Sequence, residues 1–199
     1  MKAPTPRRRR GRLRGAVRTR ELRWGDFNDL VRGYWHLYDE RDAGEPHGIT
    51  LLARKPTLAE EVEWFSTLYR RVLAGDAVAV VAEVGGRVVG HCTVGRVGRA
   101  ADAENGHVAE LGILVEHGYR GRGVGHALLR AALRRSRDRF KVVRLGVHAD
   151  NPGARRLYEE FGFRGIGAVP GGFRRGGKVV DEGLMALELG RAPGLRTKR

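Results

Sequence analysis

The segment 119–125, which reads YRGRGVG, constrains the fold of this chain more than any other part of its sequence. It follows an apolar run at 111–115 and precedes a helix-like amphipathic stretch, so the local order is strand, glycine loop, helix. Glycine lets backbone N–H groups come close to a ligand, and a helix N-terminus adds free donors with a partial positive charge. The segment therefore predicts an anion site suited to a phosphate or pyrophosphate. A glycine-rich turn with solvated arginines is the open alternative for the loop alone.

The net charge of +15 over 199 residues is concentrated at the two ends of the chain. Residues 1–20 hold nine Lys and Arg and no acidic residue, and residues 190–199 hold four and no acidic residue. The stretch between them is almost neutral. The overall basicity therefore says little about the main site.

The composition divides the chain into a basic tail at 1–14, one domain at 15–189 and a second basic tail at 190–199. The first tail is too polar to offset its ordering entropy, and we expect it to be disordered. It could contact nucleic acid or the ribosome weakly by charge neutralisation, and a simply solvated tail is the alternative.

Several classes of protein are disfavoured. No apolar run approaches the roughly 20 residues that a membrane helix needs, and the basic N-terminus lacks the apolar segment of a secretory signal. The single cysteine, Cys92, excludes an internal disulfide and a cysteine-based metal cluster. We expect a cytoplasmic protein without a metal.

Hydrophobic periodicity and turn signals predict an α/β (α+β) domain. The sheet should be mixed and mostly antiparallel, with about six or seven strands and about four flanking helices. Gly85-Gly86 predicts a two-residue hairpin, and 170–177 is expected to be a glycine-rich connection. The predicted strands are 16–22, 77–84, 87–97, 108–115, 142–148, 163–169 and 179–189, and the predicted helices are 26–41, 57–73, 123–137 and 151–161.

Taken together, three segments of the second half resemble the GNAT superfamily of N-acetyltransferases. RGRGVG at 120–125 fits the pyrophosphate loop Q/R-x-x-G-x-G/A of that family, and ELGILV at 110–115 fits the strand before it. The stretch 151–163 fits the N-x-x-A-x-x-L-Y-x-x-x-G-F segment. The similarity is sharpest at 108–165 and extends in pattern over 15–189.

This resemblance implies acetyl-CoA as co-substrate and a primary amine as acceptor. The loop backbone would bind the pyrophosphate, and the strand before the loop would pair with the pantetheine amides as with a short extra strand. Asn151 could bond the same arm or only cap its helix. The residues predicted to contact acetyl-CoA are Ile113, Leu114, Val115, Arg120, Gly121, Arg122, Gly123, Val124, Gly125 and Asn151.

The resemblance also implies catalytic roles. Tyr158 matches the family tyrosine that acts as general acid toward the CoA sulfur, and a phenol with an ordinary pKa near 10 can donate at neutral pH. Glu110 matches the place where several relatives carry a catalytic glutamate. Its competitors as base are His91, His107 and His148. One departure is Gly146, which stands where ribosomal-protein N-terminal acetyltransferases often carry a glutamate.

The acceptor itself is open between a protein N-terminus, a lysine and a small-molecule amine. An acidic cluster in the first loop, Asp39, Glu40, Asp42 and Glu45, could attract a cationic amine or be solvated. Cys92 is expected to be a small buried hydrophobe, not a nucleophile. A homodimer is possible. The alternative function is a non-catalytic acyl-CoA-binding or nucleic-acid-associated module with the same fold.

Overall fold

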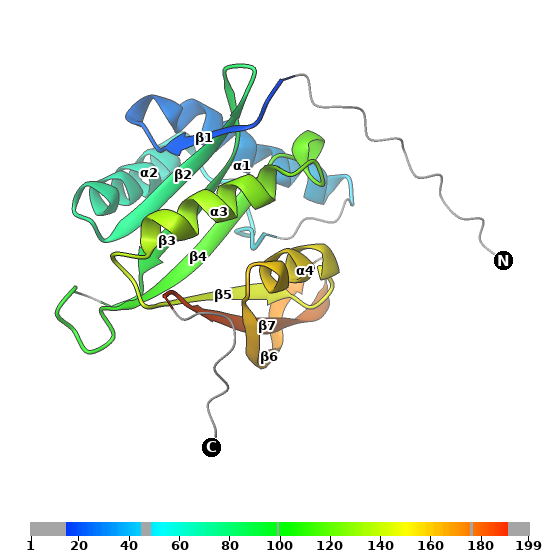
Figure 1. The fold of residues 1–199 in the computed structure, drawn as a ribbon. Coiled ribbons are helices and arrows are strands. Elements are labelled where there is room, and N and C mark those ends of the chain that lie inside the picture. Colours follow the sequence, from blue (N-terminus) through cyan, green and yellow to red (C-terminus); the bar gives the residue numbers. More distant parts are fainter. Residues whose placement is uncertain (1–14, 45–48, 99, 176, 191–199) are drawn as a thin grey trace.

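The computed structural model describes residues 15–44, 49–98, 100–175 and 177–190. Within them the chain forms one seven-stranded sheet and four α-helices, which confirms the predicted fold class (Figure 1). The strand order is β1-β2-β3-β4-β5-β7-β6, and every neighbouring pair is antiparallel except β4 and β5. The strands are β1 (Arg18–Glu21), β2 (Ala77–Val84), β3 (Arg87–Arg96), β4 (Val108–Val115), β5 (Val142–His148), β6 (Arg164–Arg175) and β7 (Lys178–Glu188). The helices are α1 (Phe27–Asp42), α2 (Leu58–Leu73), α3 (Val124–Ser136) and α4 (Pro152–Glu160), with short 3-10 turns η1 (Trp24–Asp26) and η2 (His117–Tyr119).

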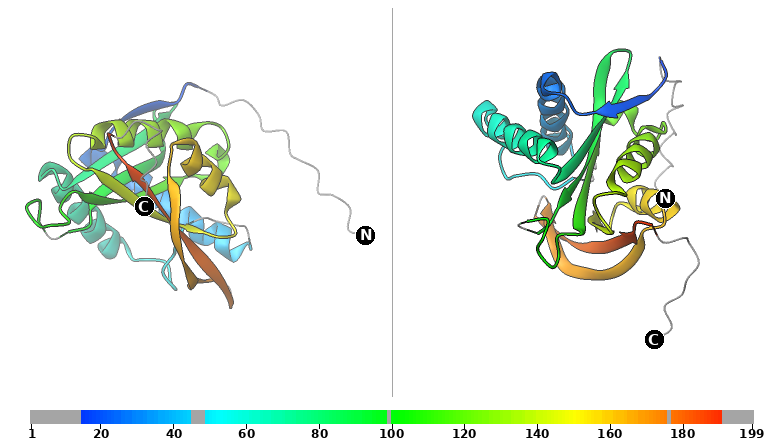
Figure 2. Two further views of the ribbon diagram at one scale, coloured as in Figure 1. Left: turned by 60° about the horizontal axis from the view of Figure 1, so that its bottom comes forward. Right: turned by 60° about the vertical axis from the view of Figure 1, so that its left-hand side comes forward.

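The helices cover opposite faces of the sheet. Figure 2 shows α1 and α2 on one side of β2–β4, and α3 and α4 on the other. Alternate side chains of the strands accordingly enter two cores. The α3 core includes Val94, Leu111 and Leu128, whereas the α1/α2 core includes Val81, Leu30 and Phe65. None of the described helices is both long and apolar enough to cross a membrane.

Local sequence signals fix several element ends. Thr57 and Glu60 form the predicted capping box, in which the Thr57 hydroxyl accepts from the Glu60 N–H and the Glu60 carboxylate accepts from the Thr57 N–H at 2.8 Å. Gly85 and Gly86 both have positive φ in the predicted hairpin turn. Asn151 caps α4 by accepting from the Ala154 N–H at 3.1 Å.

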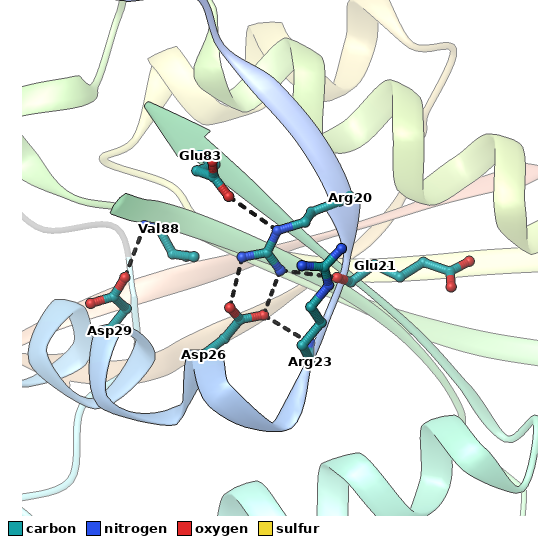
Figure 3. A network of polar contacts seen from close by, with 7 residues as sticks. All are labelled: Arg20, Glu21, Arg23, Asp26, Asp29, Glu83 and Val88. Atoms are coloured by element: carbon teal, nitrogen blue, oxygen red, sulfur yellow. Dashed lines mark hydrogen bonds and ion pairs between the residues drawn. The ribbon is translucent and has the colours of Figure 1, made fainter. Parts of the chain in front are cut away.

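A polar network fastens the edge strand β1 to its neighbours (Figure 3). The Arg20 guanidinium donates to both carboxylate oxygens of Asp26, at 2.7 and 2.8 Å, and to Glu83 of β2 at 3.1 Å. Asp29 in α1 accepts from the backbone N–H of Val88 at 2.9 Å. These contacts set the position of α1 against the sheet.

Two details differ from the sequence prediction. The expected connection at 170–177 is wrong, because β6 continues through Pro170 to Arg175. β6 is the outermost strand, where a proline costs no ladder bond, and the register shift between Val169 and Phe173 accommodates Gly171 at positive φ. The acidic cluster was also expected in a loop, but Asp39, Glu40 and Asp42 belong to the last turns of α1. Glu45 and both tails (1–14 and 191–199) lie outside the described residues.

Candidate active site

Strands β4 and β5 are paired only at their beginnings. Their parallel ladder joins Val108 to Val142, Ala109 to Val143 and Glu110 to Arg144, and no pairing follows. Beyond that point β4 stays paired with β3, and β5 stays paired with β7. The two central strands therefore diverge toward their C-terminal ends and leave a gap in the sheet.

The backbone of β4 faces this gap at two of the three predicted positions. The N–H of Glu116 donates to the Val89 carbonyl of β3 at 3.0 Å. Since backbone direction alternates along a strand, the N–H and C=O groups of Ile113 and Val115 point away from β3 and toward β5. Leu114 turns its backbone groups toward β3 instead. The edge at Ile113 and Val115 can therefore pair with amides of an extended ligand.

The glycine loop joins the end of β4 to α3. Gly121 and Gly123 have φ of 65° and 84°, and Gly123 is the N-cap of α3. The first turn of a helix has no internal acceptor for its N–H groups, which here belong to Val124, Gly125 and His126. A Cβ at Gly123 would meet no atom within 4 Å. The loop thus combines donors, a helix N-terminus and open space, which fits an anionic phosphate group.

The arginines of the loop lie differently from one another. Arg120 donates to Glu40 of α1 at 2.8 and 3.1 Å and to the Val115 carbonyl at 2.9 Å. Its guanidinium therefore holds the loop against α1 and β4. Arg122 is half-buried, and within the described residues no hydrogen bond or ion pair gives it the anchoring role of Arg120.

Helix α4 lies beside the N-terminus of α3. A Cβ at Gly125 would lie 3.1 Å from a methyl carbon of Leu157, so the two helices approach closely there. Asn151 begins α4, and its side-chain oxygen is used in the cap. The glycine loop and the Asn151–Tyr158 segment, which are about 30 residues apart in the sequence, are thereby adjacent in the fold.

Tyr158 is buried in the α3 core beside the gap. Its ring packs against Phe163 at 5.8 Å between centroids, and Cys92 belongs to the same cluster. Cys92 is the direct cross-strand partner of Ile113, whose backbone faces the gap. Burial, and to a lesser degree Cys92, raises the pKa of the Tyr158 phenol. The hydroxyl is therefore fully protonated at neutral pH and can serve as a proton donor.

Cys92 is a free, buried thiol whose pKa is raised by burial. A thiolate is the nucleophilic form of cysteine, so this environment suits a structural side chain. Among the described residues, no three His, Cys, Asp or Glu side chains cluster closely enough to hold a metal ion.

Glu110 lies at the last rung where β4 and β5 are still paired. Its side chain is 60% exposed, and its Oε2 accepts from Arg144 Nε and Nη2 at 3.2 and 3.1 Å. The carboxylate that the sequence predicts as the base therefore forms an ion pair with Arg144, at the end of the gap where β4 and β5 are still paired.

The three competing histidines occupy distinct places. His107 is exposed in the loop before β4, on the far side from the gap. His148 is buried at the end of β5, with its ring 3.8 Å from that of Phe173. His91 of β3 lies near Trp64, and burial of its ring away from water lowers its pKa to about 4. His91 and His148 face the α1/α2 side of the sheet, opposite Tyr158.

Sequence reasoning missed two side chains of the site. Glu40, the partner of Arg120, was expected in an acidic loop that attracts a cationic amine or is solvated, although Gly33, Leu37 and Glu40 share one helical spacing that points inward. Glu182 of β7 lies over Gly146 of β5. No local pattern marks it.

The sequence model of the Acetyltransferase (GNAT) family matches residues 47–163, which is more than half of the chain. This chain belongs to the GNAT acetyltransferase family. Its glycine loop, diverging strands and α4 tyrosine all lie within the matched region.

Two curated relatives and one solved structure illustrate the similarity. The chain is 34% identical over 109 residues to the L-amino acid N-acetyltransferase AaaT of Escherichia coli K12, covering 54% of this chain and 65% of that protein. It is 37% identical over 105 residues to the N-alpha-acetyltransferase RimI of Mycobacterium tuberculosis, covering 52% and 63%. The GNAT chain thus spans just under two thirds of the length of these relatives.

The fold also matches a GNAT superfamily phosphinothricin acetyltransferase from Sinorhizobium meliloti, determined in complex with AcCoA. The TM-score is 0.74 at 21% identity, over 92% of this chain and 93% of that one. At this level of identity the likeness shows the GNAT fold alone.

Proposed function

We propose that this chain is an acetyl-CoA-dependent N-acetyltransferase that transfers an acetyl group directly to a primary amine. The observation that carries the proposal is the gap between β4 and β5, which has the glycine loop at one end and Tyr158 beside it. The loop N–H groups would bind the pyrophosphate of acetyl-CoA. The edge at Ile113 and Val115 would hold its pantetheine arm. Acetyl-CoA supplies an activated thioester carbonyl when bound in this gap.

In this proposal Tyr158 supplies the proton that the departing thiolate needs. Its buried position and raised pKa keep that proton in place until the C–S bond breaks. A backbone N–H at Ile113 or Val115 would polarise the thioester carbonyl. Asn151 orients α4 through its cap, which holds Tyr158 toward the gap.

We further propose an α-amino group as the acceptor. One relative is by name an L-amino acid N-acetyltransferase, and another is by name an N-alpha-acetyltransferase. Both names place the acetyl group on a nitrogen of an amino acid or a protein. Contact of the basic N-terminal tail with nucleic acid or the ribosome, a homodimer and a cytoplasmic location stay predictions.

The test is incubation of the full chain with labelled acetyl-CoA and a panel of acceptors. The panel contains L-amino acids, peptides with a free α-amine, the same peptides with a blocked N-terminus, polyamines and aminoglycosides. We expect label on the free α-amines, and a fall in kcat of about 10²-fold or more in Tyr158→Phe with little change in CoA affinity. CoA binding without transfer to any acceptor would instead favour the non-catalytic acyl-CoA-binding module.

A further inference from the structure

Glu182 of β7 lies across the backbone of Gly146 in the neighbouring strand β5. A Cβ placed on Gly146 would lie 2.8 Å from Cδ of Glu182 and closer still to its Oε1. A Cβ placed on Gly172 of β6 would lie 2.7 Å from Cβ of Glu182. The two glycines therefore leave the space that the Glu182 side chain occupies. Any larger residue at position 146 would displace its carboxylate.

This carboxylate lies beside the open part of the gap. Pairing of β4 with β5 ends at Glu110 and Arg144, and Gly146 is the next residue of β5 on the same face. The residues that alternate with them along β5 (Val143, Leu145 and Val147) enter the α3 core. Gly146 and Glu182 therefore face the α1/α2 side, whereas Tyr158 lies on the α3 side.

The lack of a cationic partner within the described residues sets Glu182 apart from other carboxylates near the gap. Glu110 is paired with Arg144, Glu40 with Arg120, and Glu116 with Arg87. Within the described parts of the chain, Glu182 has no hydrogen-bond or ion-pair partner. A partly buried carboxylate without a cation is a suitable partner for an incoming ammonium group.

We propose that Glu182 is the catalytic carboxylate that binds the acceptor ammonium and removes its proton, in place of the glutamate that is missing at Gly146. This inference rests on the proposed N-acetyltransferase function. It deepens that function by assigning a cationic amine to the α1/α2 side of the gap, with acid and base on opposite faces of the sheet.

Glu182 and Tyr158 together account for every proton moved in the acetyl transfer. Glu182 takes one proton from the ammonium, and the freed nitrogen lone pair forms the N–C bond to the acetyl carbonyl carbon. The C–S bond breaks, its electron pair stays on sulfur, and Tyr158 gives sulfur its phenolic proton. The second proton lost by nitrogen restores the Tyr158 phenol, and Glu182 releases its proton to water. No oxidant or further reactant is needed.

Several titratable and charged groups lie on the same face of the sheet as Glu182. His148 is its direct cross-strand partner on β5, and Arg144 with Glu110 follows on the same face beyond Gly146. On β6, Val169 is the direct cross-strand partner of Glu182, and Arg164 is paired with Ala186 farther along β7. On the same side of the sheet, α1 packs mainly against β3 and α2 mainly against β2.

The first experiment compares the near-isosteric variant Glu182→Gln with the wild type, using labelled acetyl-CoA and the α-amine acceptor that the wild type uses best. We expect kcat/KM for the acceptor to fall about 10²-fold or more, with an unchanged Kd for CoA. The loss should shrink at a pH above the ordinary pKa of the acceptor amine, where the acceptor is already neutral and needs no base. Glu110→Gln should lose less activity than Glu182→Gln, and Glu159→Gln on the exposed face of α4 serves as the neutral control.

A second variant moves the carboxylate without removing it. Gly146→Ala should displace Glu182 and lower kcat/KM for the acceptor, while Gly165→Ala, whose Cβ meets no atom within 4 Å, should not. A Glu182→Gln variant within about threefold of the wild type, or one whose loss of kcat/KM is the same at every pH, overturns the assignment of Glu182 alone. If the wild type itself transfers acetyl to no acceptor, the proposed function has failed and this inference falls with it.

Discussion

Glu40 in α1 and Arg120 in the glycine loop form a two-point ion pair, at 2.8 and 3.1 Å, across 80 residues of sequence. The third contact of the same guanidinium is the Val115 carbonyl at the end of β4. One side chain thus joins the loop, the strand that borders the gap and the helix on the opposite face. The side chain of Glu40 is only 9% exposed, and Arg120 makes its two shortest contacts, with His117 Nδ1 farther away at 4.0 Å.

Breaking this pair should weaken both the fold and the cofactor loop. Replacing Arg120 by Gln removes both short contacts of the buried Glu40 carboxylate and leaves only His117 Nδ1 at 4.0 Å, which should lower the free energy of unfolding by about 1–3 kcal/mol. The Kd for CoA should rise about tenfold, since the loop loses its anchor. Urea denaturation and isothermal titration with CoA measure the two effects.

Two variants sharpen this prediction. Arg120→Lys keeps the charge but loses the fork geometry, so it should recover only part of the stability. Glu159→Gln removes an exposed ion pair with Arg155 and should change stability by about 0.5 kcal/mol or less. Equal effects of Arg120→Gln and Glu159→Gln would show that Arg120 anchors nothing.

Gly123 should be sensitive to substitution because of its backbone and not because of crowding. Its φ is 84°, where an L side chain costs about 1–2 kcal/mol, although a Cβ there would meet no atom within 4 Å. Gly123→Val should therefore raise the Kd for CoA well beyond its modest loss of stability. Gly118→Ala in η2 is the matched control, since a Cβ there also meets nothing and φ is not positive. Similar CoA affinities for both variants would exclude the loop as the pyrophosphate site.

Glu60 should make stability depend on pH in the acid range. Its hydrogen bonds with Arg54, then with the Thr57 backbone and hydroxyl, lower the pKa of the carboxyl from 4.5 to about 2. The fold thus favours the ionised form. This stabilisation is fully present above the ordinary pKa of 4.5 and is lost as the pH falls through about 2.

The variant Glu60→Gln tests this dependence by denaturation between pH 2 and 7. It should be less stable than the wild type at pH 7, and the two stabilities should converge as the pH falls from 4.5 toward 2. Glu63→Gln, on the exposed side of the same helix, should run parallel to the wild type. A pH-independent difference for Glu60→Gln would mean that only its packing matters.

The features that sequence predicted well are those decided by neighbours within about four residues. Thr57 with Glu60, Gly85 with Gly86, and Asn151 before Pro152 each complete their own hydrogen bonds locally, so a short pattern carries the information. The periodic spacing of hydrophobic residues likewise predicts the strands and helices of the GNAT fold.

The features that sequence could not supply depend on long-range register. Whether Glu40 faces Arg120 depends on how α1 crosses the sheet, and whether Glu182 covers Gly146 depends on the pairing of β7 with β5. The end of pairing after Glu110 is likewise set by two strands at once. Such contacts join residues 30 or more positions apart, and a single sequence contains no local mark of them.

Gly90 shows how closely the strands bordering the gap approach one another, and it provides the most demanding test of the packing. A Cβ at Gly90 would lie 2.6 Å from the Leu114 carbonyl oxygen, 3.2 Å from Cα of Val115 and 3.3 Å from a methyl carbon of Leu128. Two of these atoms are backbone and cannot turn away, so β3 and β4 must separate or α3 must shift. Gly90→Ala should therefore lower the free energy of unfolding by about 1–3 kcal/mol and also weaken CoA binding. Gly112→Ala, whose Cβ would lie 3.4 Å from the movable Thr93 hydroxyl, should cost less in both measurements. If both variants had wild-type stability and CoA affinity, the close contact of β3 with the end of β4 would not be what holds the gap in shape.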